Sequence, residues 1–112
     1  TKGKTMLLQH PRFDSNFRSL HLADELYIKI FDLNPPYFLK DQVRRASSSV
    51  VLNLVEGNAQ RTMRSKRRFY RIAYASCKET QACLKLINSN QSIQKEADIL
   101  GAYLYKLIQS LS

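Results

Sequence analysis

Hydrophobic positions recur at three- and four-residue steps in four successive segments of the chain, which is the spacing of one face of an α-helix. No stretch keeps the period of two that a half-buried strand would show. The pattern predicts a first helix that starts with Asp14 or Ser15 as its cap and is ended by Asn34-Pro35-Pro36, and three more over residues 38–56, 65–88 and 92–110.

Three polar turns separate these segments, and each contains residues that end helices. They are Asn34-Pro35-Pro36, Gly57-Asn58 and Asn88-Ser89-Asn90. Short connections make consecutive helices antiparallel neighbours, so the sequence predicts an all-α, up-down-up-down four-helix bundle. With 112 residues the chain has room for one domain, which we place over residues 13–112. Residues 1–12 lack the pattern and are expected to form a flexible basic arm.

Some apolar residues fall outside the main stripe of their helix. A helix that is apolar all round is covered on both sides, and four helices alone do not cover one of their members so fully. The surplus therefore predicts self-association, unless the rotation of the helix is misjudged or the arm covers a groove. The residues assigned to the oligomer interface are Leu22, Leu26, Val51, Leu52 and Val55.

The net charge of the chain bears on its binding partner rather than on its fold. Lys and Arg number 18 against 9 Asp and Glu, a net charge of +9, which favours a polyanionic partner over a merely soluble basic protein. With Phe69 taken to face the core, the opposite side of the third segment carries a row with no acid in it. This row is Arg64, Arg67, Arg71, Tyr74, Lys78, Gln81 and Lys85.

A straight row of cations suits a phosphate backbone, which needs repeated positive charges rather than a single pocket. The alternative is a solvated helix face, although such faces usually mix charges of both signs. The predicted nucleic-acid-binding residues are Arg44, Arg45, Arg61, Arg64, Lys66, Arg67, Arg68, Arg71, Tyr74, Lys78 and Lys85.

Catalytic and metal-binding patterns are not found in the sequence. His10 and His21 have no ligand residues at metal spacing, so we expect no metal, no cofactor and no enzymatic activity. Asn53, Glu56 and Gly57 are expected to be structural, with Glu56 pairing with an arginine or capping the third helix. Cys77 and Cys83 cannot bridge each other within one helix and indicate reduced thiols in a cytoplasmic protein. No apolar run is long enough for a membrane span.

The segment from Asp41 to Arg61 resembles the signature of the four-helix-bundle family encoded in intervening sequences of bacterial 23S rRNA genes. The family pattern maps onto Gln42, Arg45, Ala46, Ser49, Asn53, Glu56 and Gly57. The stretch from Arg68 to Ser76, with Glu79 following, resembles the family's third helix. The resemblance covers roughly residues 20–90, and the fourth helix matches only in type.

That family includes relatives of the accessory variability protein of diversity-generating retroelements. The resemblance implies a ring-like homopentamer and, for the retroelement branch, a basic surface that binds nucleic acid and the reverse transcriptase. The leading hypothesis is therefore an oligomeric, non-enzymatic accessory protein that binds nucleic acid, with RNA favoured over DNA. The alternative is a protein-interaction scaffold of the rRNA branch that does not bind nucleic acid directly.

Overall fold

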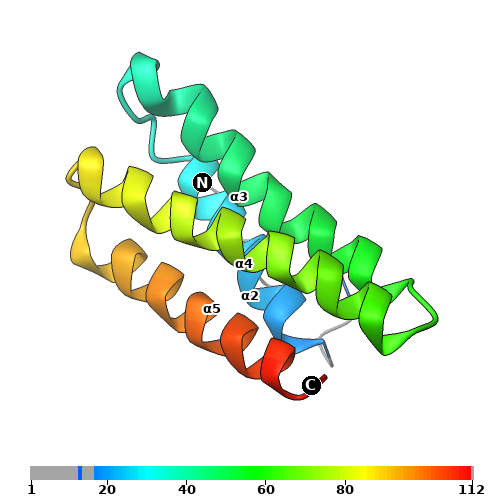
Figure 1. The fold of residues 1–112 in the computed structure, drawn as a ribbon. Helices are drawn as coiled ribbons and strands as arrows, with labels where there is room; N and C mark the ends of the chain where they lie inside the picture. The colour runs from blue at the N-terminus through cyan, green and yellow to red at the C-terminus, as the bar shows by residue number, and fades with distance from the viewer. Residues whose placement is uncertain (1–12, 14–16, 112) are drawn as a thin grey trace.

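The computed structural model describes residue 13 and residues 17–111, and this part of the chain folds as four α-helices (Figure 1). They are α2 (Arg18–Phe31), α3 (Tyr37–Asn58), α4 (Met63–Leu86) and α5 (Gln91–Gln109). The all-α prediction is confirmed for the described residues. The predicted arm over residues 1–12, with His10, and the proposed caps Asp14 and Ser15 lie outside them.

The helix ends follow local backbone chemistry. Asn34 and Asn88 adopt a positive φ of 51° after α2 and α4, which asparagine tolerates better than most residues. The Thr62 hydroxyl accepts from Ser65 N at 3.1 Å, so α4 begins two residues earlier than the pattern indicated. The Asn90 side chain accepts from Ile93 N at 2.9 Å and caps α5, a role not foreseen in a segment predicted only to break a helix.

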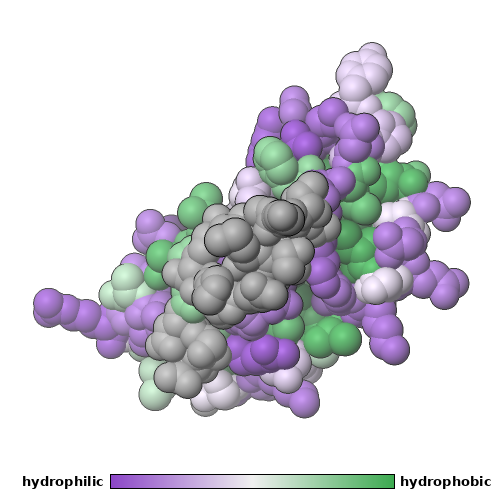
Figure 2. Space-filling model, turned by 180° about the vertical axis from the view of Figure 1, so that it is seen from behind, coloured by the Kyte–Doolittle hydropathy of each residue, from purple (hydrophilic) through white to green (hydrophobic). Residues whose placement is uncertain are grey.

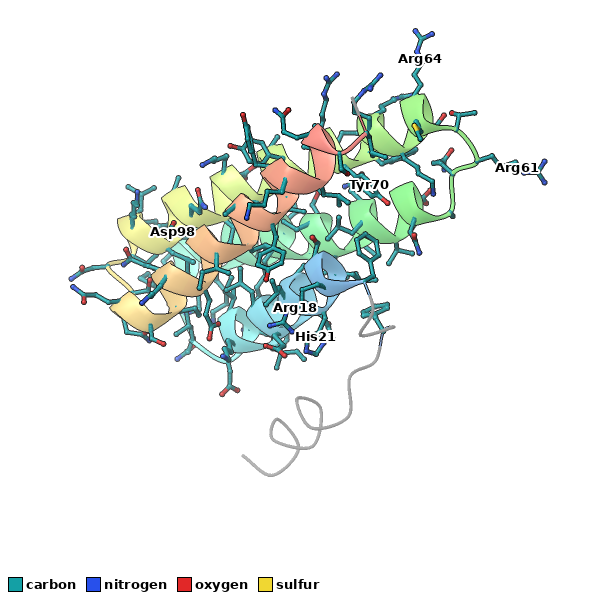
Figure 3. All side chains as sticks on the ribbon, turned by 90° about the horizontal axis from the view of Figure 1, so that it is seen from below. Arg18, His21, Arg61, Arg64, Tyr70 and Asp98 are labelled. Carbon is teal, nitrogen blue, oxygen red and sulfur yellow. The ribbon has the colours of Figure 1, made fainter. Side chains whose placement is uncertain are left out.

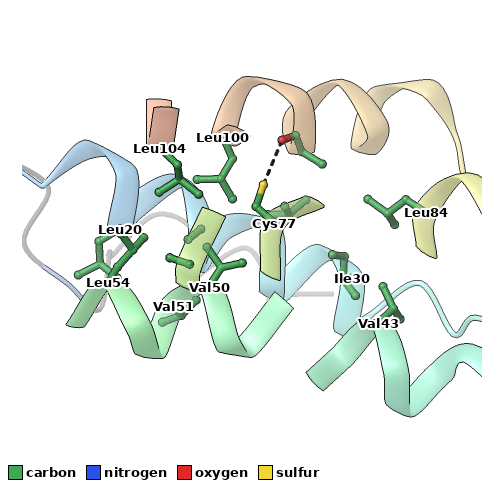
Figure 4. Close-up of a cluster of buried hydrophobic side chains, with 14 of the residues drawn as sticks. Leu20, Ile30, Val43, Val50, Val51, Leu54, Cys77, Leu84, Leu100 and Leu104 are labelled. Carbon is green, nitrogen blue, oxygen red and sulfur yellow. Dashed lines mark hydrogen bonds between the residues drawn. The ribbon is translucent and has the colours of Figure 1, made fainter. Parts of the chain in front are cut away.

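The helices pack as a bundle around one apolar core. The main contacts join α2 to α3, α3 to α4, α4 to α5 and α5 back to α2, and the α3–α4 contact is the most extensive. In Figure 1, α3, α4 and α5 lie side by side lengthwise, with α2 behind α4. Figure 4 shows side chains from all four helices meeting in the core, including those of Leu20, Val50, Cys77 and Leu100.

Small and polar residues hold α3 against α4. A Cβ added at Gly57 would lie 2.5 Å from Cε1 of the buried Tyr70 ring, so only glycine admits this contact. The hydroxyls of Ser49 and Ser76 are 2.8 Å apart, and Asn53 Nδ2 donates to the Ser49 carbonyl at 2.9 Å. The Asn53 side chain therefore has a structural contact within α3. Gly57 is structural as well, but for a different reason: it lies inside α3 and does not end it.

The rotation predicted for α4 is wrong. Phe69 is only half-buried and Ile72 is 41% exposed. The core side is instead formed by Tyr70, Ala73, Cys77, Thr80, Cys83 and Leu84. At 100° per residue this turns the helix by roughly 45° from the expected orientation. The sequence pattern could not separate the two orientations, because apolar residues occupy both sides of the true core direction.

The predicted oligomer interface is partly wrong for a related reason. Leu26 and Val51 are buried within the subunit itself, at 2% and 8% exposure, so they are not available to a second copy. Leu22 is half-buried against the same core. Leu52 and Val55 remain on the surface, at 62% and 39% exposure. Because α3 contacts both α2 and α4, it buries a wider arc than a single stripe. Across residues 17–111, no helix is long and apolar enough to cross a membrane.

Candidate nucleic-acid interface

One flank of α4 presents a line of cations to solvent. Arg64, Arg71, Lys78 and Lys85 are all exposed and follow at seven-residue intervals, which places successive charges about 10.5 Å apart along the axis. These four residues are called the basic flank below. Over its whole length α4 holds seven basic residues and one acid, Glu79. Gln42 of α3 hydrogen-bonds the Glu79 carboxylate.

The other three members of the predicted row turn toward α5. Arg67 Nη1 donates to the Leu111 carbonyl at 2.7 Å, just beyond the end of α5. The half-buried Tyr74 ring meets the Tyr105 ring with centroids 6.5 Å apart. Gln81 Nε2 donates to the Ala97 carbonyl at 3.1 Å. The row of seven is thus divided, because the rotation of α4 brings every second member against its neighbour.

Four arginines line one hollow at the beginning of α4. Arg64, Arg67, Arg68 and Arg71, with Ser65, enclose about 490 Å³. We call this the arginine hollow. No acidic residue lines it. The macrodipole of α4 adds positive potential at this end of the helix. Figure 3 shows Arg64 and Arg61 extending away from the body of the molecule at this end. Guanidinium groups and a hydroxyl are donors that suit phosphate oxygens.

Two predicted binding residues serve the fold instead. Arg44 Nη2 donates to the Phe31 carbonyl at 2.9 Å, and its guanidinium lies 4.0 Å from the Phe31 ring centroid. Lys66 Nζ donates to the Asn58 carbonyl at 3.0 Å and thus holds the end of α3. Both cations stabilise a helix C-terminus, where the macrodipole favours positive charge. Their predicted role in binding is not supported by these contacts.

The remaining predicted cations differ in position. Arg61 is exposed in the turn before α4, next to the arginine hollow in sequence. Arg68 lines that hollow, with its guanidinium 5.9 Å from the Phe69 ring centroid. Arg45 is exposed on α3, a different helix from the basic flank. The structure therefore brings Arg64, Arg67, Arg68 and Arg71 together, and leaves Arg45 apart.

The capping role considered for Glu56 is wrong, because the Thr62 hydroxyl caps α4 and the Glu56 side chain is exposed.

Cys77 and Cys83 are free and buried. Burial raises the pKa of Cys77 to about 12, with smaller opposing effects of Lys78, which lowers it, and Asp98, which raises it. Burial also raises the pKa of Cys83, with Glu79 acting in the same direction. Both thiols stay protonated at neutral pH, which makes them poor nucleophiles.

Acidic and metal-ligating groups do not gather within the part of the chain that the structure describes. His21 pairs with Glu25 one turn later in α2, and Lys29 pairs with Glu96 across the α2–α5 contact. Across the described residues no three His, Cys, Asp or Glu side chains lie close enough to hold a metal ion. The charged chemistry of this surface is thus dominated by the cations of α4.

The family model described as 23S rRNA-intervening sequence protein matches residues 16–111. The chain belongs to this family. No curated protein matches the chain. The match takes in all four helices and the arginine hollow, so the geometry above is that of a family domain and not of an appended segment.

The resemblance to the 23S rRNA-intervening sequence family can now be placed on the structure. Of its signature residues, Gln42 binds Glu79, Ser49 meets Ser76, Asn53 holds Ser49, and Gly57 admits Tyr70. Ala46 is buried in the same helix. Most of the signature therefore secures the contact between α3 and α4. The four cations of the basic flank lie outside this set of residues.

On the face seen in Figure 2, apolar groups, in green, lie beside hydrophilic side chains, in purple. Leu52 and Val55 are exposed on α3, with Ser48, Val51 and Leu52 lining a mainly apolar hollow of about 230 Å³ against Asp24 and Tyr27 of α2. The sequence allowed for a groove beside these apolar residues only as an alternative to self-association. It did not single out Tyr105 on α5, because that depends on how two helices are juxtaposed.

Proposed function

We propose that this protein is a non-enzymatic accessory protein that binds nucleic acid, RNA in particular, through the basic flank and the arginine hollow. The observation that supports this most directly is the arginine hollow, which four arginines line without an acidic residue among them. Gathering like charges costs free energy, more so at a helix N-terminus, and an anionic ligand offsets that cost.

The contact expected from this surface is with phosphates rather than with base pairs. Cations about 10.5 Å apart along one straight helix can meet several phosphates of one strand. None of the helix-turn-helix or zinc-finger arrangements that read a groove is evident in the described bundle. Binding should therefore depend strongly on salt and weakly on duplex sequence.

Assembly would multiply this contact. We place the up-down-up-down subunit in a ring-like homopentamer, as the resemblance implies, with Leu52 and Val55 in the interface. Both side chains are exposed on α3, whereas the basic flank lies on α4. Repeated copies of a weak phosphate site bind one long polyanion more tightly than a single copy does. A reverse transcriptase, as in the retroelement branch, would be a protein partner of the same assembly.

A titration over a range of salt concentrations tests the proposal. Fluorescence anisotropy with a labelled RNA hairpin and a matched DNA duplex would be measured between about 50 and about 200 mM salt. We expect binding whose logarithmic salt slope is about −0.9 for each phosphate neutralised. Replacing Arg64 and Arg71 by alanine should lower the magnitude of that slope by about two.

A complete absence of binding would contradict the proposal. If the wild-type protein binds neither probe at about 50 mM salt, where charge contacts are least screened, nucleic acid is not its ligand. The basic flank would then be a docking face for an acidic protein, as in the scaffold alternative. Co-purification of a protein partner that depends on Arg64 and Arg71 would establish that role.

A further inference from the structure

A second hollow lies between α4 and α5, beside the basic flank. It encloses about 350 Å³, and its lining includes Tyr74, Lys78 and Gln81 from α4 and Asp98, Gly101 and Tyr105 from α5. We call it the tyrosine hollow. Lys78 belongs both to this hollow and to the basic flank, so a chain bound along the flank passes its opening. Figure 3 places Asp98 on α5 beside α4.

The aromatic rings of this hollow are open to a ligand. Tyr105 is 55% exposed although it borders a cavity, and its ring meets Tyr74 at an interplanar angle of 53°. Two rings so tilted cannot sandwich a flat molecule. A planar group can, however, stack on Tyr105 and present its edge toward Tyr74. Stacking of this kind is how proteins hold unpaired bases.

The floor of the hollow is fixed. Gln81 Nε2 donates to the Ala97 carbonyl, and a Cβ added at Gly101 would lie 2.8 Å from that nitrogen. Glycine therefore lets the amide lie flat between the helices. On the other side, Lys78 Nζ lies 5.3 Å from the Tyr74 ring centroid, which orients that ring. The site is thus largely formed before a ligand arrives, which reduces the ordering cost of binding.

The charges distinguish this hollow from the arginine hollow. Its lining holds one cation, Lys78, and one anion, Asp98, whereas the arginine hollow holds four cations and no anion. A phosphate inside the tyrosine hollow would face the Asp98 carboxylate. A neutral base carries N–H groups that can donate to that carboxylate, and its ring can stack on tyrosine. The chemistry therefore favours a base over a phosphate.

We infer that the tyrosine hollow binds an unpaired base of single-stranded RNA while the flanking phosphates contact the basic flank. The inference rests on the proposed function and deepens it, by naming single-stranded segments as the preferred ligand. Bases in a duplex are stacked on one another and cannot enter without unpairing. Guanine fits best, because its N1–H and N2–H groups lie side by side and can both donate to one carboxylate.

The test compares tyrosine variants on two kinds of probe. The single-stranded probe is an oligouridine of about 12 nucleotides with one central guanine, and the paired probe is an RNA hairpin stem. We expect Tyr105→Ala to weaken binding of the single strand about tenfold and to change binding of the stem less than about twofold. Tyr103→Ala is the matched control, since Tyr103 is an exposed tyrosine of α5 that does not line the hollow.

A second, independent test of the inference uses a substitution at Asp98. Asp98→Asn should remove the preference for a central guanine over a central adenine and leave affinity for the hairpin stem within about twofold. Because the protein has no tryptophan, tyrosine fluorescence reports stacking directly. Quenching by the single-stranded probe should be smaller in Tyr105→Ala than in Tyr103→Ala.

Failure of the inference is distinguishable from failure of the proposed function. If Tyr105→Ala binds the single strand as the wild type does, while Arg64→Ala/Arg71→Ala still loses affinity, the tyrosine hollow is not a base site and the phosphate surface stands. If the wild type binds neither probe, both proposals fall together. Circular dichroism of each variant confirms that the helices are retained.

Discussion

The two longest helices of the bundle share their inner contact but differ in what they expose. α4 carries seven basic residues and one acid and presents its cations on a single flank, whereas α3 has three basic and two acidic residues and exposes Leu52 and Val55. A charged flank resists burial against another copy of itself, and an apolar one favours it. Under the proposed function, α4 binds the polyanion and α3 forms the subunit contact, so one subunit uses both surfaces at once.

The largest effect should come from placing charge on the exposed face of α3. Leu52→Glu/Val55→Glu is expected to weaken self-association about 100-fold or more, because an interface would have to bury two unpaired carboxylates. Sedimentation velocity gives the assembly mass of the variant and of the wild type.

Ile99→Glu is the matched control for this experiment, since Ile99 is an apolar residue of α5 with 41% exposure. It should leave the assembly mass unchanged. If the α3 double variant keeps the wild-type assembly mass, Leu52 and Val55 do not form the interface. The proposal that α3 is the surface for self-association would then be wrong.

The inner contact that α3 and α4 share can be tested at Gly57. Gly57→Ala would place a Cβ 2.5 Å and 2.7 Å from two carbons of the buried Tyr70 ring, and we expect it to destabilise the fold by about 1–3 kcal/mol. Gly101→Ala offers a contrast, because its Cβ meets the end of the Gln81 side chain and alanine is the better helix former. Urea unfolding should find a smaller loss in Gly101→Ala, which displaces only the end of the Gln81 side chain, than in Gly57→Ala; equal losses in both variants would contradict the role given to Gly57.

Within α4, Arg67 and Arg71 should behave differently although both line the arginine hollow. Arg67→Ala removes the bond to the Leu111 carbonyl and should lower the free energy of unfolding by about 1 kcal/mol. Arg71 is exposed, so Arg71→Ala should reduce RNA affinity and leave stability within about 0.5 kcal/mol. Thermal unfolding and anisotropy on the same samples separate the two effects. A stability loss in Arg71→Ala as large as that in Arg67→Ala would count against this distinction.

The smallest expected effect is a loss of folding stability at alkaline pH, caused by the buried thiol of Cys77 in α4. The pKa of Cys77 is raised from 9.0 to about 12 in the folded state, so the thiol ionises first in the unfolded chain. Its contribution to stability is complete below pH 9 and is lost as the pH rises from 9 toward 12. We expect the free energy of unfolding to fall by about 1 kcal/mol at pH 10, and the loss to shrink in Cys77→Ala. The raised pKa values of Cys83 and Tyr70 act in the same direction.

Periodicity was sufficient to predict four helices and their approximate ends, because turns such as Asn34-Pro35-Pro36 leave few alternatives. Periodicity did not correctly predict how α4 is rotated about its own axis. In α4 the side chains of Phe69 and Ile72 are apolar enough to suggest a core face that Tyr70 and Cys77 in fact occupy. Such an error of roughly 45° in the rotation of α4 decides which of its cations face solvent and which contact α5.

The candidate site was predictable in part for the same reason. The cations of α4 stand out in the sequence, and four of them do form the basic flank. Which of them bind helix ends, as Arg44 and Lys66 do, depends on neighbouring carbonyls that only the packed structure brings near. The tyrosine hollow joins residues of two helices, such as Lys78 and Tyr105, whose proximity no spacing within one helix can indicate.

Paired charge reversals on two helices test the central claim most directly. Arg64→Glu/Arg71→Glu on α4 and Lys95→Glu/Lys106→Glu on exposed positions of α5 change the net charge equally, so any difference between them reflects position and not total charge. At about 100 mM salt we predict that the α4 pair loses RNA affinity about 100-fold or more and the α5 pair less than about fivefold. Equal losses in the two variants would show that RNA responds only to the overall charge of the protein, and would contradict a binding surface on α4.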